Sequence, residues 1–365
     1  MIKKLLTITL SLMMIFTSFV PVFAEGEEVN IVGQYGIVID KDTGQVLYNK
    51  NAHDKMYPAS ITKILTCIVA IEMLDDLDKT ATITQSDIDT VWETGATSAD
   101  FTVGEVVTYR DMLMGAMLPS GADACRALAN NTCGNQEKFV KKMNQLVKKL
   151  GLKDSHFVNT TGIHDDDHYT TAHDMAIIFD AALKNDVFRY VDSRATYTIP
   201  ATNKYGERNC TSTNQLINGA RPYEGVYAGK TGHTAKAGRT LVTAAYRDGM
   251  DLICVIMKSD NDNFYSDTET LFDHAFLKVQ GNEQEVYAAA DDSVMAQNDL
   301  ASGLNVRQYP STSAPRIASL MPGDAVHRIG TFGNWSQVET PNGVGYVSSQ
   351  YLIFQDGTPV GTYEV

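Results

Sequence analysis

The stretch PASITKILTCIVAIEML, residues 58–74, places a serine three positions before a lysine at the start of a long apolar run. Residues 61–74 contain neither Gly nor Pro and are mostly apolar, so they predict a buried helix. Pro58 and Ser60 stand where a helix start is expected. Positions i and i+3 share one face of a helix, so the Ser60 hydroxyl and the Lys63 amine can meet.

This pairing is chemically useful because a serine attacks a carbonyl carbon only when a base takes its proton. A lysine can be that base if burial or a nearby cation lowers its pKa. The backbone N–H groups of a helix N-terminus would also stabilise a developing anion. Ser-x-x-Lys alone is a weak signal, and its simpler interpretation is a helix N-cap followed by a solvated lysine. A catalytic interpretation therefore requires partners elsewhere in the chain.

Length and composition indicate a folded protein with an export signal. The chain has 365 residues, 44% apolar and 20% charged, enough for one large domain or two unequal ones. In residues 1–24, two lysines precede an apolar run that ends in small residues, which predicts a secretory signal peptide. Its removal would change the formal charge from -14 to -16, which disfavours nucleic-acid and anionic-lipid partners. No later stretch has the ~20 apolar residues of a membrane span, so we expect no transmembrane anchor after cleavage.

The cysteines predict neither a metal site nor a disulfide framework. Their number is odd, and no two have the C-x-x-C spacing of a zinc or redox site. Of the five, Cys67 and Cys254 lie in apolar runs, and we interpret them as small core residues. The others are Cys125, Cys133 and Cys210.

The order of elements predicts an α+β fold. Residues 35–49 alternate around Asp42-Thr43-Gly44, and residues 239–257 are two β-rich runs around Arg247-Asp248-Gly249, so each predicts a hairpin. Strands at both ends with helices between them favour one antiparallel sheet with helices on its faces. Helices are predicted over residues 109–118, 122–130, 136–150, 171–184 and 267–277, a strand over 225–232, and irregular structure with short strands over 80–109.

The C-terminal part differs in composition. Residues 279–302 are rich in Ala, Asp, Glu, Gln and Asn without periodicity, and we interpret them as a linker. Residues 303–354 contain short β-type runs broken by Gly, Pro and Asn, which predicts a small all-β barrel.

Three motifs occur in the order and spacing of the penicillin-binding serine peptidases: Ser60-Ile61-Thr62-Lys63, Ser120-Gly121-Ala122 and Lys230-Thr231-Gly232. The flanking sequence is similar to that of the D-alanyl-D-alanine carboxypeptidases, the low-molecular-weight penicillin-binding proteins. The resemblance covers residues 28–278 and implies a β-lactamase/transpeptidase-like fold. The similar flanks are residues 157–162, 168–176 and 230–241.

The resemblance implies a role for each motif. Ser60 would be the acylated nucleophile, Lys63 its general base, and Ser120 the relay of a proton to the leaving amine. Lys230 would keep Lys63 neutral by like-charge repulsion. The substrate-binding residues would be Lys230, Thr231, Gly232 and His233, with the terminal carboxylate on Lys230 and Thr231 and the oxyanion hole formed by the N–H groups of Ser60 and His233.

The activity implied is that of an exported bacterial serine carboxypeptidase associated with the cell wall. It would remove the terminal D-alanine from peptidoglycan stem peptides through an acyl-serine intermediate, with β-lactams as covalent inhibitors. It would need no metal and no cofactor.

Two positions depart from the family pattern. The middle motif usually ends in Asn, which positions the substrate amide, and Ala122 stands there, so the contact would have to come from Asp123 or Asn159. Residues 258–271 contain no Arg that could bind the substrate carboxylate.

The barrel region resembles bacterial SH3-type modules, which commonly bind cell-wall peptides. The similarity lies in Leu304–Arg307, Pro310-Ser311, Gly333-Asn334-Trp335 and Gly345-Tyr346-Val347. Trp335 and Tyr346 would then contact ligand, or they are only core aromatics.

Other functions remain open from the residues alone. A D,D-endopeptidase would use the same groups. A β-lactamase would need a glutamate to activate water, and residues 159–168 offer only aspartates. A catalytically impaired wall-binding relative is suggested by Ala122. A zinc peptidase is suggested by a crowded run of possible ligands, although no H-E-x-x-H is present. That run is His164, Asp165, Asp166, Asp167, His168, His173 and Asp174.

Overall fold

The computed structural model describes residues 29–247, 249–280, 288–297, 303–307, 316–332, 335–341 and 343–360. The predicted signal peptide lies outside the described residues. No helix in the described part of the chain has both the length and the apolar character to cross a membrane.

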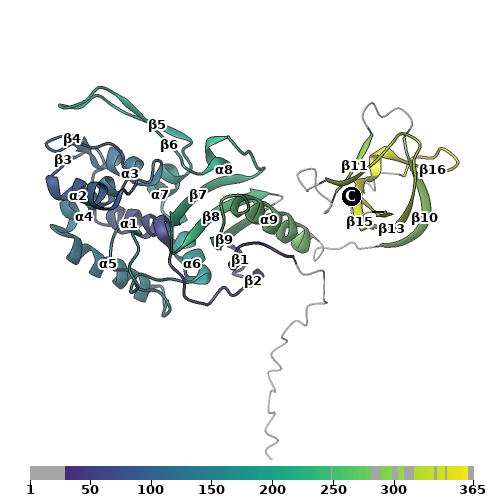
Figure 1. The fold of residues 1–365 in the computed structure, drawn as a ribbon, viewed down its shortest axis with the longest axis horizontal. Helices are drawn as coiled ribbons and strands as arrows, with labels where there is room; N and C mark the ends of the chain where they lie inside the picture. The colour runs from purple at the N-terminus through teal and green to yellow at the C-terminus, as the bar shows by residue number, and fades with distance from the viewer. Residues whose placement is uncertain are drawn as a thin grey trace, which may run out of the picture. The chain divides into compact units, whose positions relative to one another are not determined.

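A five-stranded antiparallel sheet forms the centre of the N-terminal domain, in the order β2-β1-β9-β8-β7 (Figure 1). Both predicted hairpins are present, and β1 pairs with β9, so the two ends of the domain meet in one sheet. The antiparallel sheet with helices confirms the predicted α+β class. The strands are β1 (Tyr35–Asp40), β2 (Val46–Lys50), β7 (Val226–Thr234), β8 (Gly238–Arg247) and β9 (Met250–Ser259).

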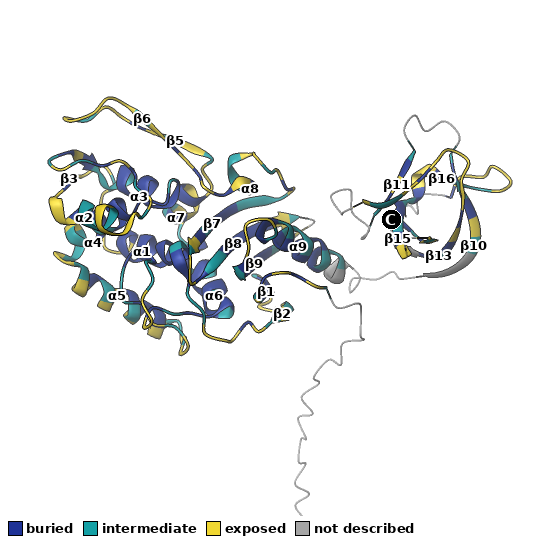
Figure 2. Cartoon of the chain, in the orientation of Figure 1, coloured by how far each residue is buried: buried dark blue, intermediate teal, exposed yellow. Residues whose placement is uncertain are grey.

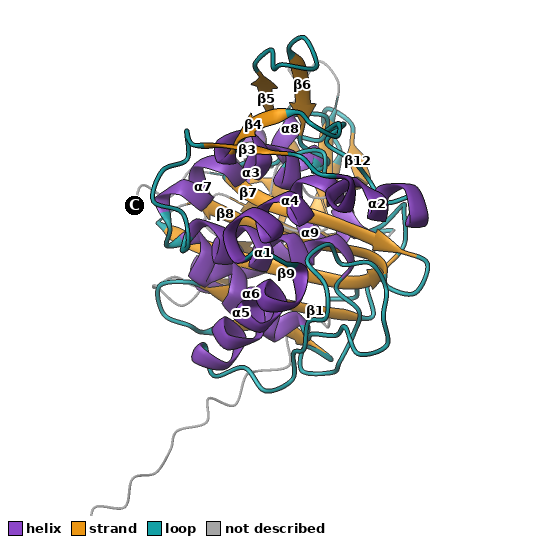
Figure 3. Ribbon diagram, turned by 90° about the vertical axis from the view of Figure 1, so that its left-hand side faces the viewer, coloured by secondary structure: helices purple, strands orange, loops and turns teal. Residues whose placement is uncertain are grey.

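Helices lie on both sides of this sheet, with α6 and α9 both in contact with β9 (Figures 1 and 3). Thr108, Asn135 and Thr171 cap the N-termini of α3, α5 and α6, since each side chain accepts a bond from a backbone N–H in the first turn. The helices are α1 (Thr62–Ile71), α2 (Gln85–Thr94), α3 (Tyr109–Met117), α4 (Ala122–Cys133), α5 (Gln136–Lys149), α6 (Ala172–Leu183), α7 (Asp186–Asp192), α8 (Gln215–Asn218) and α9 (Phe264–Gln280).

Helix α1 is the core of the helical part. All of its residues are buried, as its apolar sequence predicts, and it packs against α3, α4, α5, α6 and α7 (Figure 2). Its first turn differs from the prediction because residues Ala59–Ile61 form a separate 3-10 turn, η1. Ser60 therefore lies in η1 and Lys63 in α1.

Several elements were not predicted. Residues 80–109 contain the predicted short strands, β3 (Thr80–Thr82) and β4 (Val106–Thr108), but α2 lies between them, where the sequence predicted irregular structure. In α2 only Asp87 is buried, and its three apolar residues, Ile88, Val91 and Trp92, are too few to make a helix stand out from this polar segment. The hairpin β5 (Thr196–Ile199) and β6 (Arg208–Thr211) was not predicted either, because each of its short strands buries only one residue, Ile199 and Cys210.

All five cysteines are free, and those of α1 and β9, Cys67 and Cys254, are fully buried. The residues with described positions therefore agree with the prediction of core thiols without disulfides.

The C-terminal region is a seven-stranded antiparallel sheet in the order β12-β11-β15-β14-β13-β10-β16, which confirms an all-β SH3-like region. Its core contains Val294, Val306, Val338, Val347 and Leu352. The strands are β10 (Ala288–Ala296), β11 (Leu304–Arg307), β12 (Arg316–Leu320), β13 (Ala325–Phe332), β14 (Trp335–Thr340), β15 (Gly343–Ser348) and β16 (Leu352–Phe354).

The linker predicted over residues 279–302 needs correction. Helix α9 extends to Gln280, and residues 288–296 form β10, which pairs with β13 and β16. Of this strand, Val294 and Ala296 are buried in the core, and such small alternating residues do not stand out from an Ala- and Asp-rich composition.

Candidate active site

Ser60 and Lys63 meet as their spacing predicts. The Lys63 Nζ lies 2.8 Å from Ser60 Oγ and donates to the Thr161 carbonyl at 2.7 Å. Only 2% of Lys63 is exposed. The interpretation of Lys63 as a solvated surface lysine is therefore wrong.

The loop that supplies the Thr161 carbonyl is pressed against η1. Asn159 folds this loop, because its Oδ1 accepts from the N–H groups of Thr161 and Gly162 and its Nδ2 donates to the Ile163 carbonyl. Gly162 has a φ of +82°, and a Cβ there would lie 1.8 Å from the Ala59 carbonyl oxygen. Only glycine permits this approach.

Ser120 lies between α3 and α4 with a φ of +65°, a left-handed conformation that a residue with a side chain rarely adopts. The Thr97 hydroxyl donates to the Ser120 carbonyl and holds this turn. Ser120 is 4% exposed, and its hydroxyl has no hydrogen-bond partner. Such strain with an unpaired buried hydroxyl is typical of functional sites.

Neither proposed substitute for the missing asparagine is available. Asp123 accepts from the N–H groups of Ala99 and Phe101 and from the Ser98 hydroxyl, so it holds the loop beside the site. Asn159 is used inside its own loop. Ala122 is fully buried in the first turn of α4.

Strand β7 borders the site on the other side. A Cβ on Gly232 would lie 2.9 Å from the Ser60 backbone nitrogen, so glycine lets β7 lie directly against η1. The Thr240 hydroxyl donates to the Pro58 carbonyl at 3.0 Å and fixes the same junction. The hydroxyls of Thr231 and Thr213 are 2.6 Å apart.

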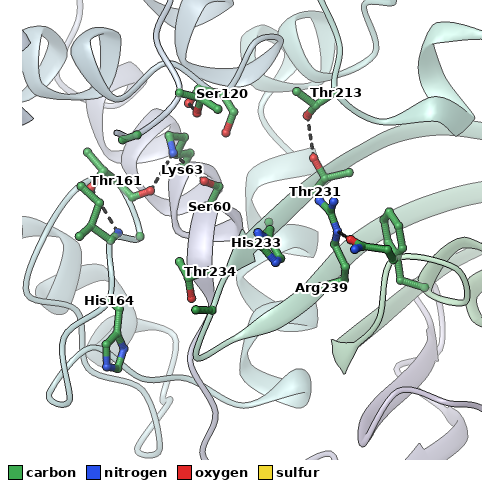
Figure 4. A pocket seen from close by; sticks show the side chains of 18 of the residues that line it. Ser60, Lys63, Ser120, Thr161, His164, Thr213, Thr231, His233, Thr234 and Arg239 are labelled. Atoms are coloured by element: carbon green, nitrogen blue, oxygen red, sulfur yellow. Dashed lines mark hydrogen bonds between the residues drawn. The ribbon is translucent and has the colours of Figure 1, made fainter. Parts of the chain in front are cut away.

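These elements surround an open pocket of about 900 Å³ (Figure 4). Six of the seven residues predicted for the site line it: Ser60, Lys63, Ser120, Thr231, Gly232 and His233. Lys230 does not line it, because its side chain is 1% exposed and its Nζ donates to the Thr231 carbonyl.

Burial sets the charge state of both lysines. It lowers the pKa of Lys63 and the pKa of Lys230, and repulsion by Lys63 helps to bring the pKa of Lys230 to about 7. Repulsion between the two amines disfavours the state in which both are charged. The site therefore holds at least one neutral amine near pH 7, which a general base requires.

A buried acid lies behind the strand. Asp192, at the end of α7, is buried, and its Oδ2 has no hydrogen-bond partner. Burial raises the pKa of Asp192 to about 7, opposed by the charge of Lys230.

His168 fixes Thr62, one of the two residues between Ser60 and Lys63. The Val158 N–H donates to its Nδ1 at 3.1 Å, so Nδ1 carries no proton and Nε2–H donates to Thr62 Oγ1 at 2.9 Å. The ring is 1% exposed, and burial lowers the pKa of His168 to about 4. Its neutral form thus ties the loop to α1.

The suspected metal cluster is dispersed. His168 binds Thr62, Asp174 accepts from the Ser155 hydroxyl and donates its N–H to Thr171 Oγ1, and His164 packs on the edge of Tyr57. In the described part of the chain, no group of three or more His, Cys, Asp or Glu residues is placed to hold a metal ion.

Several pocket residues were not predicted. Thr97, Thr213 and Arg239 line the pocket, and the Thr161 carbonyl binds Lys63. Arg239 and Thr161 lie inside the stretches that resemble the family, but their orientation depends on contacts far along the chain. Thr97 and Thr213 lie in segments without a sequence signal.

Comparison with known proteins agrees with the geometry. A family model described as D-alanyl-D-alanine carboxypeptidase matches residues 23–261, and one described as bacterial SH3 domain matches residues 302–353. The chain is 35% identical over 264 residues to the Bacillus subtilis D-alanyl-D-alanine carboxypeptidase DacF, covering 70% of this chain and 66% of that one. It is 34% identical to DacB2 of Mycobacterium tuberculosis, covering 67% and 82%. The chain thus spans about two thirds of DacF.

Solved structures match the N-terminal domain. The Streptomyces K15 DD-transpeptidase superposes with a TM-score of 0.64 at 32% identity, covering 68% of this chain and 98% of that one. A D-alanyl-D-alanine carboxypeptidase from Mycobacterium tuberculosis gives a TM-score of 0.62 at 32% identity, covering 68% and 92%.

The approach of Gly162 to Ala59 can be tested by substitution. Gly162→Ala should destabilise the fold by ~3 kcal/mol or more and abolish acylation of Ser60, because backbone must move. Gly151→Ala is the control, since Gly151 has a φ of +78° but nothing within 4 Å of a Cβ, so it carries only the backbone cost of ~1–2 kcal/mol. Urea unfolding measures both, and equal losses would contradict the contact.

Acid stability tests His168. Its pKa in the fold, about 4, lies below the ordinary 6.5, so its contribution is complete above pH 6.5 and is lost as the pH falls toward 4. The loss should reach about 3 kcal/mol. His168→Gln should flatten the decline of unfolding free energy with pH over this range, whereas the exposed His53→Gln should not. An unchanged decline in His168→Gln would refute the role of the ring.

Proposed function

The chain belongs to the D-alanyl-D-alanine carboxypeptidase family, and from this premise we propose that it is an exported serine carboxypeptidase that trims peptidoglycan stem peptides. It removes the terminal D-alanine through an acyl-serine intermediate on Ser60. Family membership supports the reaction class, and the signal-like residues 1–24 support export. β-Lactams are expected to acylate the same serine.

The observation that carries the proposal is the buried contact between Ser60 Oγ and Lys63 Nζ at 2.8 Å. A neutral amine at that distance can take the hydroxyl proton as the oxygen attacks the carbonyl carbon. The Thr161 carbonyl accepts one amine hydrogen and so orients the lone pair of the nitrogen. This arrangement supports Lys63 as the base for acylation.

The remaining groups support the following steps. Ser60 Oγ bonds to the carbonyl carbon, and the resulting oxyanion is bound by the N–H groups of Ser60 and His233, each worth ~3 kcal/mol in such sites. The proton held by Lys63 passes through the unpaired Ser120 hydroxyl to the leaving amine, and D-alanine departs. Water then attacks the acyl ester and releases the shortened peptide and Ser60.

Lys230 acts from behind the strand. Its Nζ is buried and donates to the Thr231 carbonyl, so it supports the backbone of β7 beside the pocket. The substrate face of β7 is then formed by Thr231, Gly232 and His233.

The bacterial SH3 domain would hold the enzyme at its polymeric substrate. A wall-binding module raises the local substrate concentration without new chemistry. Tyr346 is partly exposed, as expected for a ligand contact, although its hydroxyl accepts a bond from Gln337 within the sheet.

Labelling tests the acyl-serine. Wild type should form a covalent adduct with fluorescent penicillin and release D-alanine from an acyl-D-alanyl-D-alanine peptide. Ser60→Ala should lose the adduct and at least about a thousandfold in rate. Ser193→Ala, an exposed serine outside the pocket, is the matched control.

Ser120→Ala separates the proton relay from the nucleophile. It should still bind the peptide but form the acyl-enzyme about a hundredfold or more slowly, because the leaving amine receives its proton less readily.

The acyl-serine proposal as a whole would be contradicted if wild type is not labelled by penicillin, or if labelling survives in Ser60→Ala.

A further inference from the structure

Two arginines line the pocket, and their surroundings differ. Arg221 is neutralised, because its Nε and one terminal nitrogen donate to the two Glu269 oxygens at 2.6 and 2.7 Å. Arg239 donates through Nε to Asn261 Oδ1, and its guanidinium lies over the Phe264 ring, 5.5 Å from the centroid. In the described part of the chain, Arg239 has no carboxylate partner.

Arg239 is placed on the face of the sheet that borders the pocket. It is directly opposite His233 in the β7–β8 ladder, and Thr231 lies two residues from His233 on the same face. Thr231 and Arg239 are therefore diagonal neighbours, within reach of long side chains. Figure 4 shows the guanidinium directed toward Thr231.

The other cations near the pocket are not available to a ligand anion. The Lys63 amine is held by Ser60 and Thr161, and Lys230 is buried behind β7. Burial, with the charge of Arg239, lowers the pKa of His233, so this ring is neutral at pH 7. Positive charge facing the pocket beside Thr231 therefore comes from Arg239.

We propose that Arg239, with the Thr231–Thr213 hydroxyl pair, binds the terminal carboxylate of the substrate peptide. This rests on the proposed function. Asn261 occupies only Nε–H, so the terminal guanidinium nitrogens keep four N–H donors for a carboxylate. The two threonine hydroxyls share one hydrogen bond, so one of their protons stays free to donate to the same carboxylate.

This assignment accounts for the absence of arginine in residues 258–271. That segment contributes Asn261 and Phe264, which orient the guanidinium. Asn261 accepts from its Nε, and the Phe264 ring packs against one of its faces. The cation itself comes from the neighbouring strand β8. A guanidinium held in this way loses little freedom when it binds a carboxylate.

The test measures binding in a Ser60→Ala background, where no chemistry occurs. Calorimetry compares an acyl-D-alanyl-D-alanine peptide with the same peptide as its C-terminal amide. The acid should bind about 10- to 100-fold more tightly, as a charge-assisted contact implies. Arg239→Gln should reduce this preference to less than about twofold and leave the affinity for the amide unchanged. Arg239→Lys should keep an intermediate preference, because charge remains without the planar fork.

Arg221→Gln is the control, since it removes a pocket arginine already paired with Glu269, and it should keep the full preference for the acid. A preference that survives in Arg239→Gln, an equal loss for acid and amide, or no binding of either peptide would overturn the assignment. The proposed function fails separately, if the full chain with Ser60 intact prefers the acid yet releases no D-alanine.

Discussion

The arrangement of the site depends on burying the Lys63 amine between the Ser60 hydroxyl and the Thr161 carbonyl. An ammonium group loses its hydration there, so its neutral form is favoured. The space exists because α1 is buried on all sides and because the loop after Asn159 closes over the first turn. Helix packing and the loop therefore together favour the neutral form of the Lys63 amine.

Unfavourable backbone conformations gather around this lysine. Ala59 and Ser120 have positive φ values although both carry side chains, and Gly162 adopts one where a Cβ would overlap Ala59. For Ala59 and Ser120 such a conformation costs ~1–3 kcal/mol each and persists only where the surroundings impose it. Here the surroundings are the buried α1, the Asp123-anchored loop and strand β7. The packing of the core thereby holds these backbone conformations in place beside the pocket.

The sequence predicted the parts whose pattern is local. The apolar run of α1, the two hairpins and the three motifs indicated the sheet, the buried helix and six pocket residues. It did not predict α2 or the hairpin β5–β6, which bury few residues, nor β10, whose small alternating side chains were interpreted as a linker. The contacts of Thr161, Thr213 and Arg239 also escaped, because they depend on register and on loops distant in sequence. The sequence showed Ala122 in place of the asparagine, but only the structure shows that Asp123 holds the loop of Ala99 and that Asn159 is used within its own loop.

The pairing of β1 with β9 has a consequence for the time course of folding. Strand β1 is an inner strand of the sheet, and the Val32 N–H just before it donates to Asp267, 235 residues later. The sheet therefore cannot be completed until nearly the whole domain has been synthesised, and closing so long a loop is slow. During synthesis β1 and β2 therefore lack their partner strand on one side until β9 has been made.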